Sequence, residues 1–356
     1  MVKTMTPLHR AEAFCDAYGL DAPILMAPMA GASPPALAAA VMRGGGMGAC
    51  GALSMDADGI ADWTARVRAA ANGAFQINTW IPDAPPRRDP AHEARVRAFL
   101  EDWGPPVPDD AGDAPAPSFE SQCAAMMAAG PSVVSSIMGL YPSDLVAAMK
   151  ARGIRWFAAV TTVADARAAV EAGADAVVAQ GAEAGGHRGT FAPEDAERGM
   201  IGTFALVPAV ADAVSVPVIA TGGIGDARGV AAALMLGASA VQVGTVLLRT
   251  PEAGLPAPWA DAIGGAAPED TMATRAFSGR TARAIRNVYA ESAMPDPAPY
   301  PLQRAFTAPM RAAAQAAGDT DRMQMWAGQS ARLARTDGAA ELVAQMWRDA
   351  RRLLAA

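Results

Sequence analysis

The segment 179–189, Ala-Gln-Gly-Ala-Glu-Ala-Gly-Gly-His-Arg-Gly, places one histidine, His187, among four glycines directly after an apolar run. Glycine lacks the Cβ that would block unusual backbone angles or the approach of a flat ring, so this composition predicts a loop wrapped around a ligand. An imidazole can take or give a proton near neutral pH without a large shift of its pKa. A lone histidine is more often a hydrogen-bonded structural residue, but its place in this loop favours a chemical role for His187.

Glycine and polar residues also close other apolar runs of the chain. One run ends in 27–31 (Ala-Pro-Met-Ala-Gly) and another reaches Asn78. Two later runs end in 220–226 (Ala-Thr-Gly-Gly-Ile-Gly-Asp) and 242–245 (Gln-Val-Gly-Thr), and free backbone N–H groups of such glycine turns can bind a phosphate. Taken singly, the Gly-Gly pair indicates a tight turn, Asn78 a cap, and 27–31 core and turn. Their recurrence at the ends of strand-like runs predicts one site for a phosphate-bearing ligand.

Short runs rich in β-branched residues predict the elements that position these side chains. Most of the intervening segments are Ala-rich with helical spacing, as in 162–172, and end at a glycine such as Gly173. The turn Gly-Ala-Asp/Ser-Ala, at 173–176 and again at 237–240, fits the return from helix to strand. This alternation predicts an α/β fold, a (β/α)8 TIM barrel with its ligand site where the strands end. The eight predicted strands cover residues 24–28, 46–53, 75–80, 133–138, 156–162, 176–180, 216–221 and 240–247.

Two stretches depart from this repeat. Residues 81–118 are rich in Pro and Asp around a short helix expected near 93–102, which predicts an inserted loop after strand 3. From 251 to 335, Pro and Gly interrupt helical patterns, which predicts a small C-terminal helical cap that serves as a substrate domain. We therefore expect the barrel over 1–250, the cap over 251–335, and a C-terminal helix over 336–356 that packs on the barrel.

Composition and charge limit the function classes. At 356 residues, with 52% hydrophobic and 18% charged, the chain can bury a large core. Its net charge of −7 and its lack of basic runs argue against a nucleic-acid partner. Cys15, Cys50 and Cys123 show no metal-ligand spacing, which predicts reduced thiols, no metal and a cytoplasmic location. The N-terminus lacks a signal-peptide pattern and the charge-free run 229–248 contains interrupting polar residues, so no membrane association is expected.

In their order along the chain, these segments resemble the nitronate monooxygenase family, formerly called 2-nitropropane dioxygenases. The resemblance covers most of the chain, and its specific part is 183–189, Glu-Ala-Gly-Gly-His-Arg-Gly. The segments 277–283 and 326–330 also look like family segments. The resemblance implies a nitronate monooxygenase-like flavin oxidoreductase that uses FMN and no bound metal.

The resemblance also implies roles for individual residues. His187 would be the catalytic base that takes the α-proton of a nitroalkane or stabilises an anionic nitronate. Gln329 and Ser330 would border the substrate pocket. The implied FMN contacts are Met29 and Asn78 at the isoalloxazine, Gln180 near the ring or ribityl chain, Gly185 and Gly186 in the loop, and Gly222, Gly223, Gly244 and Thr245 at the phosphate.

The implied reaction is the oxidation of an alkyl nitronate by O2 to a carbonyl compound and nitrite, in which the flavin carries the electrons. The partners would be a small nitronate or nitroalkane and O2, with a homodimer as one candidate assembly. Two alternatives stay open. An NAD(P)H-dependent flavin reductase, of the enoyl-acyl-carrier-protein reductase or quinone reductase type, would share the barrel. A phosphosugar isomerase or aldolase would share the phosphate turns, but no lysine lies at a predicted strand end.

Overall fold

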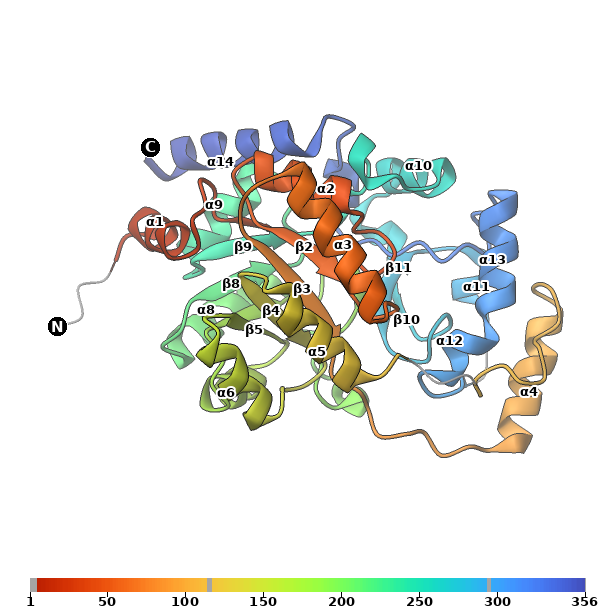
Figure 1. Ribbon diagram of the computed structural model, residues 1–356. Coiled ribbons are helices and arrows are strands. Elements are labelled where there is room, and N and C mark those ends of the chain that lie inside the picture. Colours follow the sequence, from red (N-terminus) through yellow and green to blue (C-terminus); the bar gives the residue numbers. More distant parts are fainter. Residues whose placement is uncertain (1–4, 114–116, 293–295, 356) are drawn as a thin grey trace.

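The centre of the computed structural model is a barrel of eight parallel strands, and residues 5–113, 117–292 and 296–355 are described (Figure 1). Residues 1–4 of the expected N-terminus, 114–116 of the insertion, 293–295 of the cap and residue 356 lie outside the described residues. The sheet runs in the order β1-β9-β8-β6-β5-β4-β3-β2. Its strands are β1 (Ile24–Met26), β2 (Gly48–Gly51), β3 (Phe75–Trp80), β4 (Val133–Ile137), β5 (Arg155–Val160), β6 (Ala176–Gln180), β8 (Val218–Thr221) and β9 (Ala240–Val243).

The barrel closes between its first two strands. A parallel bridge joins Leu25 to Met47, and the Met26 N–H donates to the Met47 carbonyl at 2.9 Å. The predicted TIM barrel and all eight predicted strands are confirmed. The last strand is shorter than predicted, because the backbone of Gly244 turns away (φ −122°, ψ −77°) and a 3-10 turn, Thr245–Leu247, follows.

Helices cover the outside of the barrel between successive strands (Figure 1). The chain returns from helix to strand through Gly173 and Gly237, whose φ angles of +99° and +114° are ones that other residues rarely adopt. The predicted helix over 162–172 is confirmed as Val163–Glu171, with the Thr162 side chain as its N-cap. The helices around the barrel are α1 (Pro7–Tyr18), α2 (Pro35–Arg43), α3 (Ala57–Ala70), α5 (Phe119–Ala129), α6 (Ser143–Ala151), α7 (Val163–Glu171), α8 (Thr203–Ala213), α9 (Ala227–Met235) and the C-terminal α14 (Ala339–Ala355).

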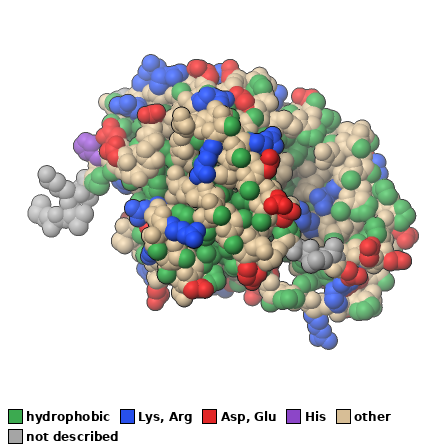
Figure 2. All heavy atoms as spheres, viewed as in Figure 1, with side chains coloured by type: hydrophobic (Ala, Val, Ile, Leu, Met, Phe, Trp, Pro, Cys, Tyr) green, Lys and Arg blue, Asp and Glu red, His purple; other side chains and the backbone are tan. Residues whose placement is uncertain are grey.

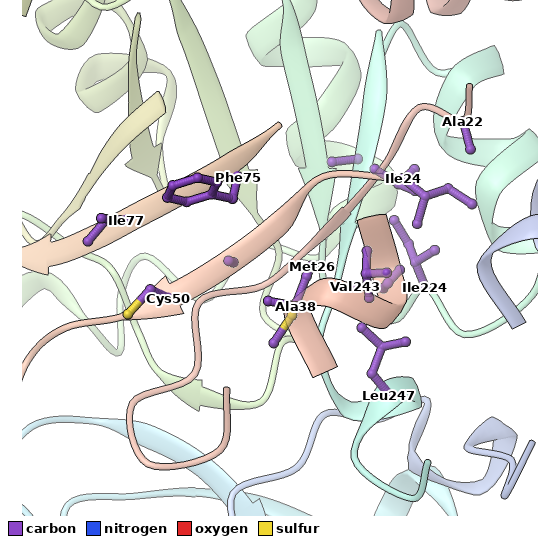
Figure 3. Close-up of a cluster of buried hydrophobic side chains, with 14 of the residues drawn as sticks. Ala22, Ile24, Met26, Ala38, Cys50, Phe75, Ile77, Ile224, Val243 and Leu247 are labelled. Atoms are coloured by element: carbon purple, nitrogen blue, oxygen red, sulfur yellow. The ribbon is translucent and has the colours of Figure 1, made fainter. Parts of the chain in front are cut away.

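Two apolar clusters form the core of the barrel. One lies between the sheet and the surrounding helices and includes Ile24 and Phe75 (Figure 3). The other contains side chains from the starts of the strands, among them Leu25 and Phe157, and packs against Phe14 of α1. Helix α1 therefore covers the end where the strands begin, and a ligand must enter from the opposite end, where they finish.

The insertion after β3 and the C-terminal segment share one apolar cluster, beside the barrel (Figure 1). Val96 and Leu100 of α4 pack with Phe277, Tyr289 and Phe306. The predicted short helix near 93–102 is thus confirmed as α4, and it packs as part of the cap. The helices of this lobe are α4 (Pro90–Glu101), α11 (Val288–Glu291), α12 (Leu302–Phe306) and α13 (Ala308–Ala317). Helix α10 (Ala257–Gly265) packs in a separate apolar cluster with Leu248 and Ala331.

The cap also contains a small antiparallel sheet that the sequence patterns did not predict. Its order is β10-β11-β7, formed by β10 (Thr271–Thr274), β11 (Ala282–Ile285) and the two-residue β7 (Gly186–His187). These strands are short, and their Ala, Thr and Arg residues do not alternate clearly between apolar and polar side chains. The pairing of β7 with β11 attaches the cap directly to the histidine loop. Further 3-10 turns are Pro193–Asp195, Pro251–Ala253, Pro268–Asp270 and Ala331–Leu333.

Acidic and basic side chains are interspersed on the face of the molecule shown in Figure 2. Across the described ranges, none of the helices combines the length and apolar character needed to cross a membrane. The run 229–248 is instead divided between α9, β9 and the following 3-10 turn.

Candidate active site

A cavity of about 470 Å³ lies at the ends of the barrel strands, under the cap. This volume lies within the range of small-molecule sites. Its wall combines strand ends, the loops that follow them and side chains from the cap. Of the predicted site residues, those that line it are Met29, Asn78, Gln180, Gly185, Gly186, His187, Gly222, Gly223, Gly244, Thr245 and Ser330. Gln329 is not part of the lining; its backbone N–H donates to the Glu183 carbonyl at 2.9 Å.

The loop that carries His187 is held from both sides. On the barrel side, the Gln180 amide at the end of β6 donates to the His187 carbonyl at 3.0 Å and accepts from the Gly189 N–H at 2.8 Å. On the cap side, the short strand β7 pairs His187 with Ala282 of β11. Backbone pairing therefore fixes the position of His187, and both ends of the Gln180 amide contribute to this.

The imidazole of His187 sits among aromatic rings and hydroxyl groups. Its Nε2 lies 2.8 Å from the Ser278 Oγ, a buried hydroxyl that also donates to the Arg280 carbonyl at 3.2 Å. Trp80 and Trp326 contact the ring edge to face, with centroids 4.8 and 5.1 Å away. These contacts restrict the rotation of the ring and hold it at the cavity wall.

Burial is the main reason that the pKa of His187 falls from 6.5 to about 3, and the positive charges of Arg280, Arg304 and Arg311 lower it further. The imidazole is therefore neutral at neutral pH. A neutral ring can accept a hydrogen bond or a proton at one nitrogen, as a general base must.

Arg188, the conspicuous cation of the same loop, supports the backbone. Its two terminal nitrogens donate to the carbonyls of Gln180 and Gly199, each at 2.5 Å, and the side chain is buried. Burial lowers the pKa of Arg188 to about 10. The guanidinium ties the end of β6 to the segment before α8, and it does not line the cavity.

Gly185 and Gly328 allow the histidine loop and the C-terminal segment to cross in close contact. A Cβ on Gly185 would lie 2.5 Å from the backbone nitrogen of Gly328, and a Cβ on Gly328 would lie 2.6 Å from the Glu183 carbonyl oxygen. The Gly328 N–H donates to the Thr245 Oγ1 at 2.9 Å, so this crossing also reaches the 3-10 turn that follows β9. Only glycine fits at either position without moving backbone.

The turns after β8 and β9 form another part of the cavity wall, and the turn after β8 lies against the loop that carries His187. Gly222 and Gly223 have φ angles of +112° and +72°, and a Cβ on Gly223 would lie 3.2 Å from the Glu183 Cβ. Within the described residues, no hydrogen bond uses the backbone N–H groups of Gly223, Ile224, Gly244 or Thr245. Free N–H groups on glycine turns form an anion site, so we call these four residues the phosphate cradle.

Met29 and Asn78 also line the cavity. Asn78 is buried and donates from Nδ2 to the Ser135 Oγ at 3.1 Å, which leaves its amide oxygen free of any partner in the described part of the chain. The Met29 sulfur approaches Gly244, whose added Cβ would lie 3.3 Å from it. An apolar thioether and one amide in a largely apolar wall suit a flat, heteroatom-bearing ring.

Several residues of this site were not predicted from the sequence, and we single out Trp80, Ser278, Arg304, Arg311 and Trp326. All five line the cavity, and all but Trp80 come from the cap. Ser278 and Trp326 lie in the two downstream segments that resembled the family, so the signal was present without a role attached to it. The arginines of α12 and α13 carried no local signal, because exposed helix faces also contain arginine.

Comparisons with known proteins agree with this geometry. The family model described as nitronate monooxygenase matches residues 12–349. A nitronate monooxygenase of Paraburkholderia phytofirmans is 40% identical over 97% of this chain and 96% of its own length, and one of Pseudomonas aeruginosa is 39% identical over 93% and 97%. The solved structure of a nitroalkane oxidase from Streptomyces ansochromogenes superposes with a TM-score of 0.87 at 35% identity, covering 96% of this chain and 99% of that one.

Proposed function

This chain belongs to the nitronate monooxygenase family and is an oxidoreductase, and from this premise we propose that it oxidises alkyl nitronates with O2, using FMN, to a carbonyl compound and nitrite. The observation that carries the proposal is that the wall of a single cavity contains both a neutral histidine and free backbone N–H donors. These are the two features that a phosphate-bearing redox cofactor and a substrate with an acidic C–H bond require.

The residues of the cavity fit FMN. The phosphate cradle offers unpaired backbone N–H groups, and a side chain at Gly223 would contact Glu183. The phosphate would therefore be bound by the backbone N–H groups and not by side chains. Met29 and Asn78 would contact the isoalloxazine, Gln180 would lie near the ring or the ribityl chain, and Gly185 and Gly186 would allow the loop to approach it. When bound, FMN would accept electrons from the nitronate and pass them to O2.

The protein's own contribution is to position the substrate and move one proton. We propose that His187 accepts the α-proton of a neutral nitroalkane. If the Ser278 hydroxyl donates to the Arg280 carbonyl, Nε2–H donates to Ser278 and Nδ1 carries the free lone pair. Ser330 would border the substrate, and Trp80 and Trp326 would exclude water around the imidazole.

Aerobic turnover of ethyl nitronate tests this function. We expect O2 consumption and nitrite release in proportion, at a rate well above that of the buffer with free FMN. NADH and NADPH, offered with a quinone or an enoyl thioester, are expected to be consumed far more slowly. Rapid NAD(P)H consumption without nitrite release from the nitronate would replace this proposal with the reductase alternative.

A further inference from the structure

Two arginines from the cap line the cavity that also contains His187. Arg304 belongs to α12 and Arg311 to α13, and both helices lie over the ends of the strands. Arg304 donates to the Ser54 Oγ at 3.0 Å across the cavity mouth. Positive charge is therefore placed on the cap side of the cavity that also contains the phosphate cradle.

The partners of Arg311 are all neutral. Its guanidinium donates to the Thr307 Oγ1 at 3.1 Å, to the Arg304 carbonyl at 2.8 Å and to the Gln324 Oε1 at 2.8 Å. A guanidinium has five N–H donors, so two stay available. In the part of the chain that the structure describes, no carboxylate lies within ion-pair distance of Arg304 or Arg311.

An enclosed cation without a counter-ion is unfavourable, and a second cation beside it adds repulsion. Burial, with a smaller contribution from the charge of Arg304, lowers the pKa of Arg311 to about 10. The same two charges help to keep His187 neutral, so the histidine cannot supply the counter-charge of an anionic ligand. Only the arginines can do so on this side of the cavity.

A second donor in the same cavity also lacks a partner. The indole N–H of Trp259, in α10, is buried and has no acceptor among the described residues, and Trp259 lines the cavity. Buried N–H donors in proteins usually have a hydrogen-bond acceptor. The cap side thus offers hydrogen-bond donors and positive charge together, and its ligand should be an acceptor that carries negative charge.

We propose that Arg311, supported by Arg304, binds a planar oxyanion, and that in turnover this anion is the pair of oxygens of the nitronate group. This proposal rests on the proposed function for the identity of the substrate. The planar guanidinium matches two coplanar oxygens through parallel N–H···O bonds, which an ammonium group cannot do. The site would select the anionic nitronate over the neutral nitroalkane, because only the anion gains from the two charges.

Titration calorimetry with nitrate, an unreactive planar oxyanion, tests this site in the flavin-loaded enzyme. We expect the Kd of nitrate to rise at least tenfold in Arg311→Met. It should also rise in Arg311→Lys, because an ammonium group cannot offer the two parallel N–H donors of the planar guanidinium. Arg286→Met is the matched control, since Arg286 is a cap arginine that pairs with Glu291 outside the cavity. In this control we expect the Kd to stay within twofold of the parent value.

Kinetics supply the second readout. In Arg311→Met the KM of ethyl nitronate should rise at least tenfold, while the KM of neutral nitroethane should change much less. If Arg311→Met does not fold, Arg311→Gln replaces it, because glutamine can still hydrogen-bond to Thr307. The same rise in the KM of ethyl nitronate is expected for this variant. A nitrate Kd that is unchanged in all three Arg311 variants overturns the site. Arg311-dependent nitrate binding in an enzyme that does not oxidise nitronates would support the anion site and contradict the proposed function alone.

Discussion

Replacement of His187 by Asn is expected to lower kcat/KM for a neutral nitroalkane by about 10²- to 10⁴-fold, the usual contribution of a positioned general base. Asparagine keeps a polar side chain of similar reach, but its amide cannot take a proton at neutral pH. On preformed ethyl nitronate, where the α-proton is already gone, we expect a loss of less than about tenfold. The measurement is steady-state nitrite release with each substrate at a fixed pH.

The control for this variant is His92→Asn. His92 is half-buried on α4, where its Nε2 lies 2.8 Å from the Asp296 carbonyl oxygen, and it does not line the cavity. It should retain parent activity on both substrates. Equal activity of His187→Asn and the parent on neutral nitroethane would remove His187 from the proton-transfer step. An equal loss on both substrates would assign His187 to nitronate binding or ring positioning instead.

Replacement of Gly223 by Asp is expected to raise the Kd of FMN on the order of 100-fold, measured by the quenching of free FMN fluorescence on binding. Aspartate tolerates a φ near +72° better than most residues, so the backbone change is modest. The dominant effect is a carboxylate beside the bound phosphate, since two like charges about 4 Å apart repel by roughly 4 kcal/mol at an effective dielectric constant of about 20. Partial exposure to solvent reduces this value.

Gly254→Asp is the matched control for backbone strain. Gly254 has a φ of +63°, an added Cβ there would meet nothing within 4 Å, and the residue does not line the cavity. We expect its FMN affinity to equal that of the parent. If both aspartate variants bind FMN as tightly as the parent protein, the phosphate does not lie at the phosphate cradle.

The barrel could be predicted because its signals are local. Runs of β-branched residues mark the strands. The glycines between a helix and the next strand, such as Gly173, are needed because the turn there has a positive φ angle. The strand-end glycines could be assigned to a shared site because parallel strands finish at the same end of a barrel. The predicted end of the last strand at 247 was wrong, because Val246 and Leu247 are buried in a 3-10 turn just as they would be in a strand.

The cap side of the site could not be predicted, because its contacts join segments far apart in the chain. Ser278 reaches His187 across 91 positions of sequence, and the apolar cluster of the cap combines α4 with Phe277 and Phe306. No periodicity within either segment specifies such a pairing. The pairing of β7 with β11 shows the same limit, since a two-residue strand has no pattern of its own.

The central claim is that a flavin in this cavity takes electrons from a nitronate held beside His187. It is tested most directly by mixing the flavin-loaded enzyme with ethyl nitronate in the absence of O2 and following the flavin absorbance in a stopped-flow instrument. We predict complete loss of the oxidised flavin spectrum with one nitronate per flavin, and no comparable loss with NADH or NADPH. A flavin that stays oxidised with excess nitronate, or that only a reduced nicotinamide bleaches, would contradict the account.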